Sequence, residues 1–254
     1  MALAITTSPK PQPPRILLYG VPGIGKTTIG SRFPKPLLIP VEEGADNLSV
    51  ARTPTPTGWR DFLAMLEDIA ESDYGYSTLV IDSVSALQEL LFTHVCESHG
   101  VASIELAAGG YGKGYIEAAD HWRCMLQVLD RIRTAKSMII VGIGHMATIA
   151  HQDPRLPAYD RMQPRLHVSG KGAGMLPTTV EWADIVACCA YEVYTTEQGS
   201  KTPRGVGDGQ RIMYLQERPA YLAKNRYGLP ESIPMDASVL LSSIKSHLAT
   251  KNKE

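Results

Sequence analysis

The sequence reads Gly20-Val21-Pro22-Gly23-Ile24-Gly25-Lys26-Thr27-Thr28 near its start, which is the pattern G-x-x-x-x-G-K-T. The apolar run 15–19 precedes this segment and predicts a short buried strand. The residues that follow, 29–33, predict the start of a helix that Pro34 ends. A strand, a glycine-rich loop and a helix in this order are the context that a P-loop requires. We therefore predict a P-loop here.

The residue types of this segment suit a phosphate ligand. Gly20, Gly23 and Gly25 allow the backbone to turn tightly and to aim its N–H groups at phosphate oxygens. Lys26 supplies a positive charge for the outer phosphates, and the hydroxyl of Thr27 suits Mg²⁺. The predicted cofactors are accordingly ATP and Mg²⁺.

The composition is that of an ordinary globular protein. Its 254 residues are 44% hydrophobic and 20% charged, which is enough chain for one substantial core. The net charge of −1 neither favours nor excludes a nucleic acid, so any such site must be local. The four cysteines lack the spacing of a zinc site, and no apolar run is long enough to span a membrane. We expect a cytoplasmic protein with free thiols.

Three further apolar runs, 36–41, 77–83 and 137–143, predict buried parallel strands that end in polar side chains. Ligands of open α/β sheets bind at the carboxyl ends of strands. Asp82 closes a Walker-B pattern, so we expect it to hold Mg²⁺ through water. Glu42 and Glu43 form either part of a ligand site or a solvated turn, and His145 either faces a γ-phosphate or makes a structural hydrogen bond. The predicted nucleotide-binding residues are Gly20, Val21, Pro22, Gly23, Ile24, Gly25, Lys26, Thr27, Thr28 and Asp82, of which Thr27 and Asp82 would hold the metal.

Helical periodicity predicts helices over 58–72, 84–99, 116–134 and 236–249. Residues 1–14 are rich in proline and predict an extended arm, which either adds a strand to another subunit's sheet or frays. A strand is predicted near 183–188, and 195–209 predict a hairpin turn or a disordered tip. Residues 210–216 and 220–224 predict two strands that pair with each other.

Two segments, 107–115 and 147–177, combine glycines with aromatic or basic side chains. Such segments suit single-stranded nucleic acid, because bases stack on aromatic faces and phosphates attract cations. The first segment is alternatively a flexible connection between helices. The second has no convincing secondary structure, and long stretches of this kind are often functional. The predicted DNA-binding residues are Tyr111, Lys113, Tyr115, Arg155, Arg161, Arg165 and Lys171.

These features follow one another in a recognisable order: a P-loop, a strand ending in glutamate, a Walker-B aspartate, a strand ending in a polar residue, a long basic loop, and K-x-R on a late strand. The order resembles the RecA-like ATPase core over residues 15–234, nearly the whole chain. Within that superfamily the chain is similar to the short phage-encoded recombination ATPases, the Sak-four group of single-strand annealing proteins. Segments 111–115 and 223–230 carry this narrower similarity.

The resemblance implies roles for residues outside the P-loop. Glu42 takes the position of the carboxylate that orients the attacking water, with Glu43 as the alternative. His145 takes the sensor position, where many relatives have glutamine. Lys224 and Arg226 resemble the pair that reaches the γ-phosphate of a neighbouring subunit, which implies a homo-oligomer, either a ring or a filament. The predicted catalytic residues are Glu42, Lys26, His145, Lys224 and Arg226.

The expected fold is one α/β domain, a mostly parallel twisted sheet flanked by helices with an antiparallel extension on its C-terminal side. It would comprise an arm (1–14), a RecA-like core (15–234), and a C-terminal helix and tail (235–254). The expected function is DNA-stimulated ATP hydrolysis at a subunit interface in phage recombination or single-strand annealing, in the bacterial host cytosol. Single-stranded DNA is the expected partner, with a single-strand-binding protein as a further candidate and no membrane partner. The rivals are a P-loop kinase of a small molecule or nucleotide, with 151–171 as its lid, and an ATP-switch loader protein.

Overall fold

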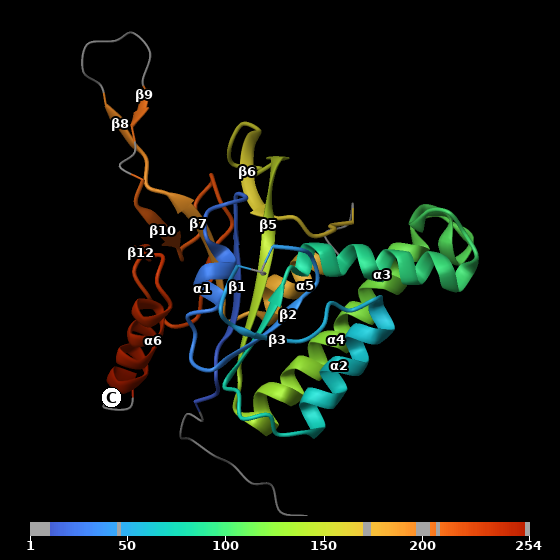
Figure 1. The fold of residues 1–254 in the computed structure, drawn as a ribbon. Helices are drawn as coiled ribbons and strands as arrows, with labels where there is room; N and C mark the ends of the chain where they lie inside the picture. The colour runs from blue at the N-terminus through green and yellow to red at the C-terminus, as the bar shows by residue number, and fades with distance from the viewer. Residues whose placement is uncertain (1–10, 45–46, 170–173, 197–203, 207–208, 252–254) are drawn as a thin grey trace, which may run out of the picture.

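A ten-stranded sheet lies at the centre of the computed structural model, which describes residues 11–44, 47–169, 174–196, 204–206 and 209–251 (Figure 1). The strand order along its main path is β12-β10-β7-β1-β5-β4-β2-β3. From β7 to β3 the strands are parallel, whereas β10 and β12 are antiparallel to their neighbours. This arrangement confirms the predicted fold, a mostly parallel α/β sheet with an antiparallel extension.

The strands of this sheet are β1 (Arg15–Gly20), β2 (Pro36–Pro40), β3 (Ala51–Arg52), β4 (Thr78–Asp82), β5 (Ile139–His151), β6 (Tyr159–Pro164), β7 (Ile185–Tyr191), β10 (Arg211–Tyr214), β11 (Lys224–Asn225) and β12 (Ser232–Pro234). A separate antiparallel pair consists of β8 (Tyr194–Thr196) and β9 (Arg204–Val206). The helices are α1 (Lys26–Gly30), α2 (Trp59–Glu71), α3 (Val84–His99), a 3₁₀ helix (Ile104–Gly109), α4 (Lys113–Lys136), α5 (Met175–Trp182) and α6 (Ala237–Lys251). The helices predicted over 58–72, 84–99, 116–134 and 236–249 are therefore confirmed.

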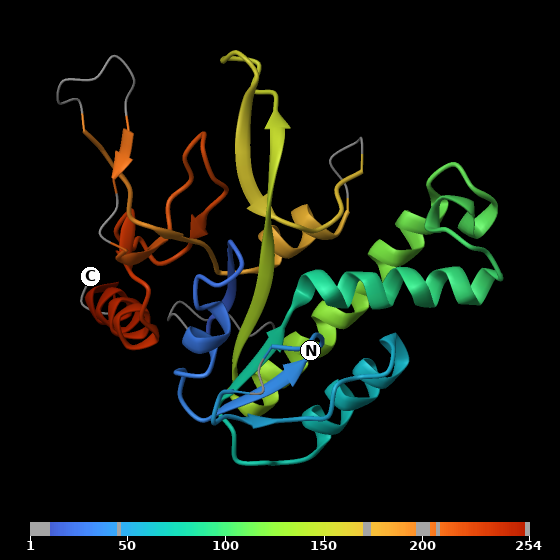
Figure 2. The same ribbon diagram turned by 45° about the horizontal axis from the view of Figure 1, so that its top comes forward.

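Strand β1 is buried on both faces of the sheet, because its successive side chains alternate between two cores. Leu17 and Tyr19 belong to the core that α2, α3, α4 and α5 cover. Ile16 and Leu18 belong to the core that α1 and α6 cover, on the other face (Figure 2). Because the sheet is covered on both sides, its central parallel strands are apolar runs rather than alternating ones, which is why the sequence identifies them.

The strand register brings the ends of several strands to a shared edge of the sheet, which we call the carboxyl edge. Gly20 at the end of β1 pairs with His145 in β5, and Pro40 at the end of β2 pairs with Asp82 in β4. Strand β5 lies between β1 and β4. The P-loop, the Walker-B aspartate and His145 therefore lie along one edge, as the sequence predicts. The opposite ends of the same strands form the amino edge.

The segment 147–177, predicted to lack secondary structure, contains regular elements over 147–151, 159–164 and 175–177. Strand β5 continues past His145 to His151 and forms an antiparallel hairpin with β6, and α5 begins at Met175. The prediction is wrong because β6, with the sequence YDRMQP, is mostly polar and ends in proline, as a loop does. Its strand conformation comes from pairing with β5, and the hairpin rises beyond the carboxyl edge (Figure 1).

The segment 107–115 is likewise more ordered than predicted. Its first residues belong to the 3₁₀ helix, and α4 begins at Lys113, so Gly114 and Tyr115 are helical. Gly114 is buried, and a Cβ atom there would lie 2.3 Å from the carbonyl oxygen of Ile104. The glycine thus permits close packing of α4 against the 3₁₀ helix.

The two late strands do not pair with each other, which corrects the prediction for 210–216 and 220–224. Strand β10 pairs with the carboxyl half of β7, and β11 pairs with its amino half. The intervening chain turns back at Arg218 and Tyr221, whose backbones bond to each other, and Leu222 N donates to the carbonyl of Met162 in β6. The antiparallel extension therefore contacts the β5–β6 hairpin.

Some predictions fall outside the described residues: most of the arm 1–14, the tip 197–203 between β8 and β9, and Lys171. The described part of the arm joins the fold, because Ile140 N donates to the carbonyl of Pro14. At the other end, α6 packs Leu240 and Ile244 into the core below α1. Among the described helices, none has both the length and the apolar character needed to cross a membrane.

Candidate nucleotide-binding site

The P-loop turns between β1 and α1 with a geometry that only glycine supports at its end. Gly25 has a φ of 100° and caps the N-terminus of α1. The next residue, Lys26, is buried, and its Nζ donates hydrogen bonds to the carbonyl oxygens of Gly20 at 2.9 Å and Val21 at 3.0 Å. Burial lowers the pKa of Lys26, while the charges of Asp82 and Glu42 oppose that shift. The ammonium therefore lies within the loop, held by its carbonyl oxygens.

Thr27 and Asp82 meet although they lie far apart in the sequence. Oγ1 of Thr27 donates to Oδ2 of Asp82 at 2.5 Å. Asp82 is 8% exposed, and burial raises its pKa, an effect that the hydrogen bond from Thr27 and the charge of Lys26 reduce. A hydroxyl and a carboxylate thus converge beside the P-loop, where their oxygens suit a hard cation.

Glu42 and His145 form a second pair at the same edge. Nε2 of His145 lies 2.9 Å from Oε1 and 3.1 Å from Oε2 of Glu42. The neighbouring Glu43 is exposed and Glu42 is half-buried, so the contact distinguishes the two glutamates. The backbone of His145 is held on both sides: its N–H donates to Oγ of Ser85, and its carbonyl accepts from the N–H of Arg165.

The two pairs belong to one electrostatic group. The charges of Glu42, Lys26 and His145 all act on the carboxylate of Asp82. Four predicted strand-end or P-loop side chains, Lys26, Asp82, Glu42 and His145, are therefore brought together with Thr27.

The oxygens of Thr27 and Asp82 fit Mg²⁺. In the described part of the chain, no cluster of three or more His, Cys, Asp or Glu side chains is arranged to hold a metal. A magnesium ion here would therefore have few protein ligands, which is how Mg²⁺ binds when phosphates and water supply the rest of its shell.

Lys224 and Arg226 lie away from this site, at the amino edge. β11 pairs with Val186 and Ile185 at the start of β7, whereas Gly20 pairs with Cys189 near its end. Three to four residues of strand correspond to about 10–13 Å along the sheet. Nζ of Lys224 donates to the carbonyls of Val180, Glu181 and Ala183 at the end of α5.

Arg226 is held at the same edge but is more accessible. Its Nη1 donates to Oδ1 of Asp184 at 3.0 Å and its Nη2 to the carbonyl of Glu181, yet 47% of its side chain is exposed. Neither cation reaches the P-loop of its own subunit.

The predicted DNA-binding residues differ in availability. Arg161 is 9% exposed and its Nη2 lies 2.6 Å from Oε1 of Glu217, and Tyr115 stacks on His167 and donates to Glu105. Arg155 pairs with Asp153 but remains 86% exposed. Three others are exposed in the structure: Tyr111, Lys113 and Arg165.

Arg211 is a side chain near the P-loop that the sequence does not indicate. Arg211 is the first residue of β10, and its guanidinium lies against Gly25. No motif marks it, since the contact joins residues 186 positions apart.

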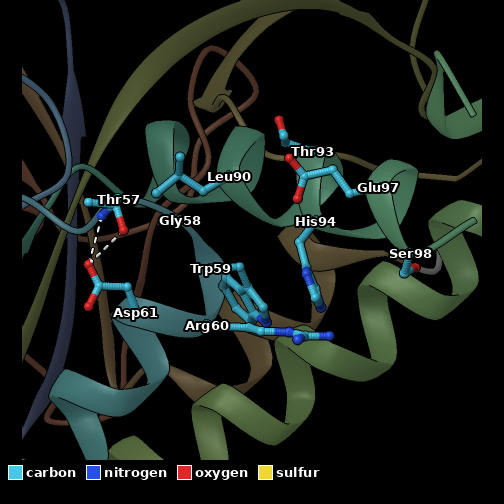
Figure 3. A pocket seen from close by; sticks show the side chains of 10 residues that line it. All are labelled: Thr57, Gly58, Trp59, Arg60, Asp61, Leu90, Thr93, His94, Glu97 and Ser98. Carbon is cyan, nitrogen blue, oxygen red and sulfur yellow. Dashed lines mark hydrogen bonds between the residues drawn. The ribbon is translucent and has the colours of Figure 1, made fainter. Parts of the chain in front are cut away.

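A pocket of about 510 Å³ lies elsewhere, between the start of α2 and one side of α3 (Figure 3). Figure 3 shows Arg60 passing beneath the ring of Trp59 toward His94, with Asp61 turned to Thr57. None of the side chains that converge at the carboxyl edge lines this pocket.

Two comparisons with known proteins bear on this site. The sequence profile of a family described as "AAA domain" matches residues 12–227, which include the whole carboxyl edge. A SPbeta prophage-derived uncharacterized protein, YorG, of Bacillus subtilis (strain 168) is 28% identical over 101 residues. That alignment covers 38% of this chain and 31% of the relative, so the chain matches about a third of the relative's length.

Proposed function

Because the chain belongs to the AAA-domain family of P-loop ATPases, we propose that it hydrolyses ATP in response to single-stranded DNA. The observation that carries this proposal is the path from Glu42 through His145 to Arg165. Glu42 contacts the ring of His145, and the carbonyl of His145 accepts a hydrogen bond of 2.8 Å from Arg165 N. A ligand that moves Arg165 thus acts directly on the partner of a carboxylate at the P-loop.

The residues of the carboxyl edge take distinct roles in this proposal. Lys26 would exchange the carbonyls of its own loop for the outer phosphates, and Thr27 and Asp82 would hold Mg²⁺. When bound, Mg²⁺ neutralises charge on the phosphates. Glu42 orients the attacking water, and His145 fixes the orientation of Glu42.

The proposed DNA surface consists of Tyr111, Lys113, Arg155 and Arg165, with Tyr111 99% exposed. Tyr111 offers a face for base stacking, and the cations neutralise phosphates. Arg161, in contrast, holds the β5–β6 hairpin against Glu217. The similarity to a prophage-derived protein supports a phage origin. We propose that the DNA-stimulated hydrolysis serves phage recombination or single-strand annealing.

We further propose assembly into a homo-oligomer, which the location of Arg226 supports. In its own subunit this side chain lies at the edge opposite the P-loop, so any role at a nucleotide would be at a neighbour's site. An arginine supplied in trans accelerates P-loop hydrolysis by about 10³-fold or more. Mixing Arg226→Ala with Lys26→Ala would then restore activity, because each variant supplies what the other lacks. Mixed oligomers that stay inactive would contradict this arrangement.

The test is the rate of ATP hydrolysis with and without single-stranded DNA, in the wild type, Lys26→Ala and Arg165→Ala. Arg131→Ala is the matched control, because Arg131 is an exposed arginine on α4 that pairs with Glu67. We expect Lys26→Ala to be inactive, and Arg165→Ala to keep its basal rate but lose most of the stimulation by DNA. Equal stimulation of Arg165→Ala and Arg131→Ala would contradict the path through His145. A rate that depends on a small acceptor and not on DNA would indicate a kinase.

A further inference from the structure

Arg211 is fixed beside the P-loop by the antiparallel extension of the sheet. Its backbone pairs with Tyr191 at the end of β7, and its carbonyl accepts a hydrogen bond of 2.9 Å from Met235 N, just after β12. It thus starts from the carboxyl edge, where Gly20 lies beside Cys189 of the same strand β7. The position of the side chain is therefore a consequence of the sheet and not of a free loop.

The guanidinium approaches the P-loop closely. A Cβ atom on Gly25 would lie 2.8 Å from Nη1 of Arg211 and 3.8 Å from its Cζ. Position 25 favours glycine because its φ of 100° is left-handed. The guanidinium of Arg211 lies in the space beside it. The contact places a planar group with several N–H donors next to the residue that precedes Lys26.

Among the described residues, no acidic side chain pairs with Arg211. Within the described ranges, no hydrogen bond or ion pair joins its guanidinium to another residue, and the side chain is exposed. Other arginines of this chain are paired, such as Arg15 with Asp184, Arg161 with Glu217 and Arg218 with Glu231. A cation next to a loop that already contains Lys26 repels it unless an anion lies between them.

We propose that Arg211 binds the phosphate chain of the nucleotide in the same subunit. The guanidinium geometry suits two parallel hydrogen bonds to phosphate oxygens. This inference rests on the proposed nucleotide site and adds to it a ligand from the antiparallel extension. It differs from the role of Arg226, which acts only on a neighbouring subunit, because Arg211 acts at any protein concentration.

The experiment is to measure the dissociation constant for Mg²⁺-ATP by calorimetry in the wild type, Arg211→Ala, Arg211→Gln and Arg211→Lys. A hydrogen bond to a charged group corresponds to about 10- to 100-fold in affinity, so we expect Arg211→Ala and Arg211→Gln to bind that much more weakly. Arg211→Lys should recover part of the loss. Arg218→Ala is the matched control, because Arg218 lies in the same extension and pairs with Glu231, and it should bind as the wild type does.

Inorganic tripolyphosphate identifies the group that Arg211 contacts. As a competitor that lacks the base, it should lose affinity for Arg211→Ala by the same factor as ATP. A loss confined to ATP would overturn the proposal, because it would place the guanidinium on the base. Unchanged ATP affinity in Arg211→Ala, with binding abolished in Lys26→Ala, would overturn the inference and leave the nucleotide site standing. If the wild type itself binds no ATP, the proposed function fails. Thermal unfolding of each variant shows whether it is folded.

Discussion

Buried charged side chains have weak compensation at one edge of the sheet and strong compensation at the other. At the carboxyl edge, burial raises the pKa of Asp82 and lowers that of Lys26, so both ionised forms are disfavoured. At the amino edge, burial on its own would raise the pKa of Asp184, but the hydrogen bonds and charge of Arg15, with the charge of Arg133, hold it below its usual value. Two aspartates of one sheet thus have pKa values shifted in opposite directions.

The difference lies in the partners that each aspartate has. Asp184 accepts from N, Nε and Nη2 of Arg15 and from Nη1 of Arg226, and Nη2 of Arg133 lies 3.5 Å away. The guanidinium of Arg15 also lies over the ring of Trp182, at 5.3 Å. Asp82 has one hydrogen bond from a hydroxyl. We infer that the ion pairs of the amino edge stabilise the fold, while the charged side chains of the carboxyl edge remain available to bind a ligand.

The largest expected effect is on stability at the amino edge. Asp184→Asn keeps the shape of the side chain but removes the buried carboxylate that Arg15 and Arg133 share, and leaves Arg15 with Asp130 alone. Breaking a buried ion pair in this way costs about 3–5 kcal/mol. Urea unfolding should report a loss of this size in the free energy of unfolding. Asp130→Asn is the control, because Asp130 pairs with the same Arg15 but is 39% exposed, and its loss should be well under 1 kcal/mol.

The same carboxylate predicts the acid response. Because the pKa of Asp184 is lower in the folded protein than in the unfolded chain, its contribution is fully present above the unfolded value near 3.8. It is lost as the pH falls through the lower, folded value. The free energy of unfolding should therefore fall more steeply below pH 4 in the wild type than in Asp184→Asn. Parallel curves for the two proteins would show that Asp184 is not the group that titrates.

A smaller effect is expected for Glu42, the carboxylate proposed to orient the attacking water. Glu42→Gln should slow ATP hydrolysis by about 10²-fold, about 2.7 kcal/mol in barrier, with ATP binding retained. Glu43→Gln is the matched control, since Glu43 is exposed while Glu42 contacts His145. Single-turnover rates of the two variants decide between the glutamates. A loss of hydrolysis in Glu43→Gln alone would assign the proposed role to Glu43 instead of Glu42.

The smallest effect has the opposite sign to that at Asp184. Asp82→Asn should raise the free energy of unfolding of the nucleotide-free protein at pH 7, by about 1 kcal/mol, because it removes an under-compensated buried charge. The sign follows from the pKa of Asp82, which is higher in the folded protein than its usual value of 3.8. The folded protein therefore loses stability as the pH rises from 3.8 through the pKa of the folded state. Urea unfolding at pH 7 measures this change in the free energy of unfolding. A destabilised Asp82→Asn would show that the hydrogen bond from Thr27 outweighs the cost of burying the charge.

The sequence predicts the carboxyl edge well because its information is local. A P-loop between strand and helix identifies Lys26 and Thr27, and the rule that ligands bind at the ends of parallel strands identifies Asp82, Glu42 and His145. The roles of these residues stay predictions. The parallel sheet and its helices follow from apolar runs and helical periodicity, which tertiary contacts do not override here.

What the sequence does not predict depends on distant partners. Arg161 has the side chain expected of a DNA-binding residue, but it pairs with Glu217, which lies 56 positions later. Lys224 and Arg226 are bound by the end of α5, and nothing in their own segment shows this. The contact of Arg211 with Gly25 requires the register of β10 on β7. Each of these contacts joins residues far apart in the sequence, which local patterns do not encode.

The most direct test of the difference between the two edges is the rise in melting temperature that Mg²⁺-ATP produces in the wild type, Asp82→Asn and Asp184→Asn. A ligand stabilises only a protein that binds it. We predict that Asp184→Asn melts at a lower temperature without ligand but shows the wild-type rise with Mg²⁺-ATP. Asp82→Asn should melt at a higher temperature without ligand and lose most of the rise. A wild-type rise in Asp82→Asn, or its loss in Asp184→Asn, would contradict the assignment of ligand binding to the carboxyl edge and of stability to the amino edge.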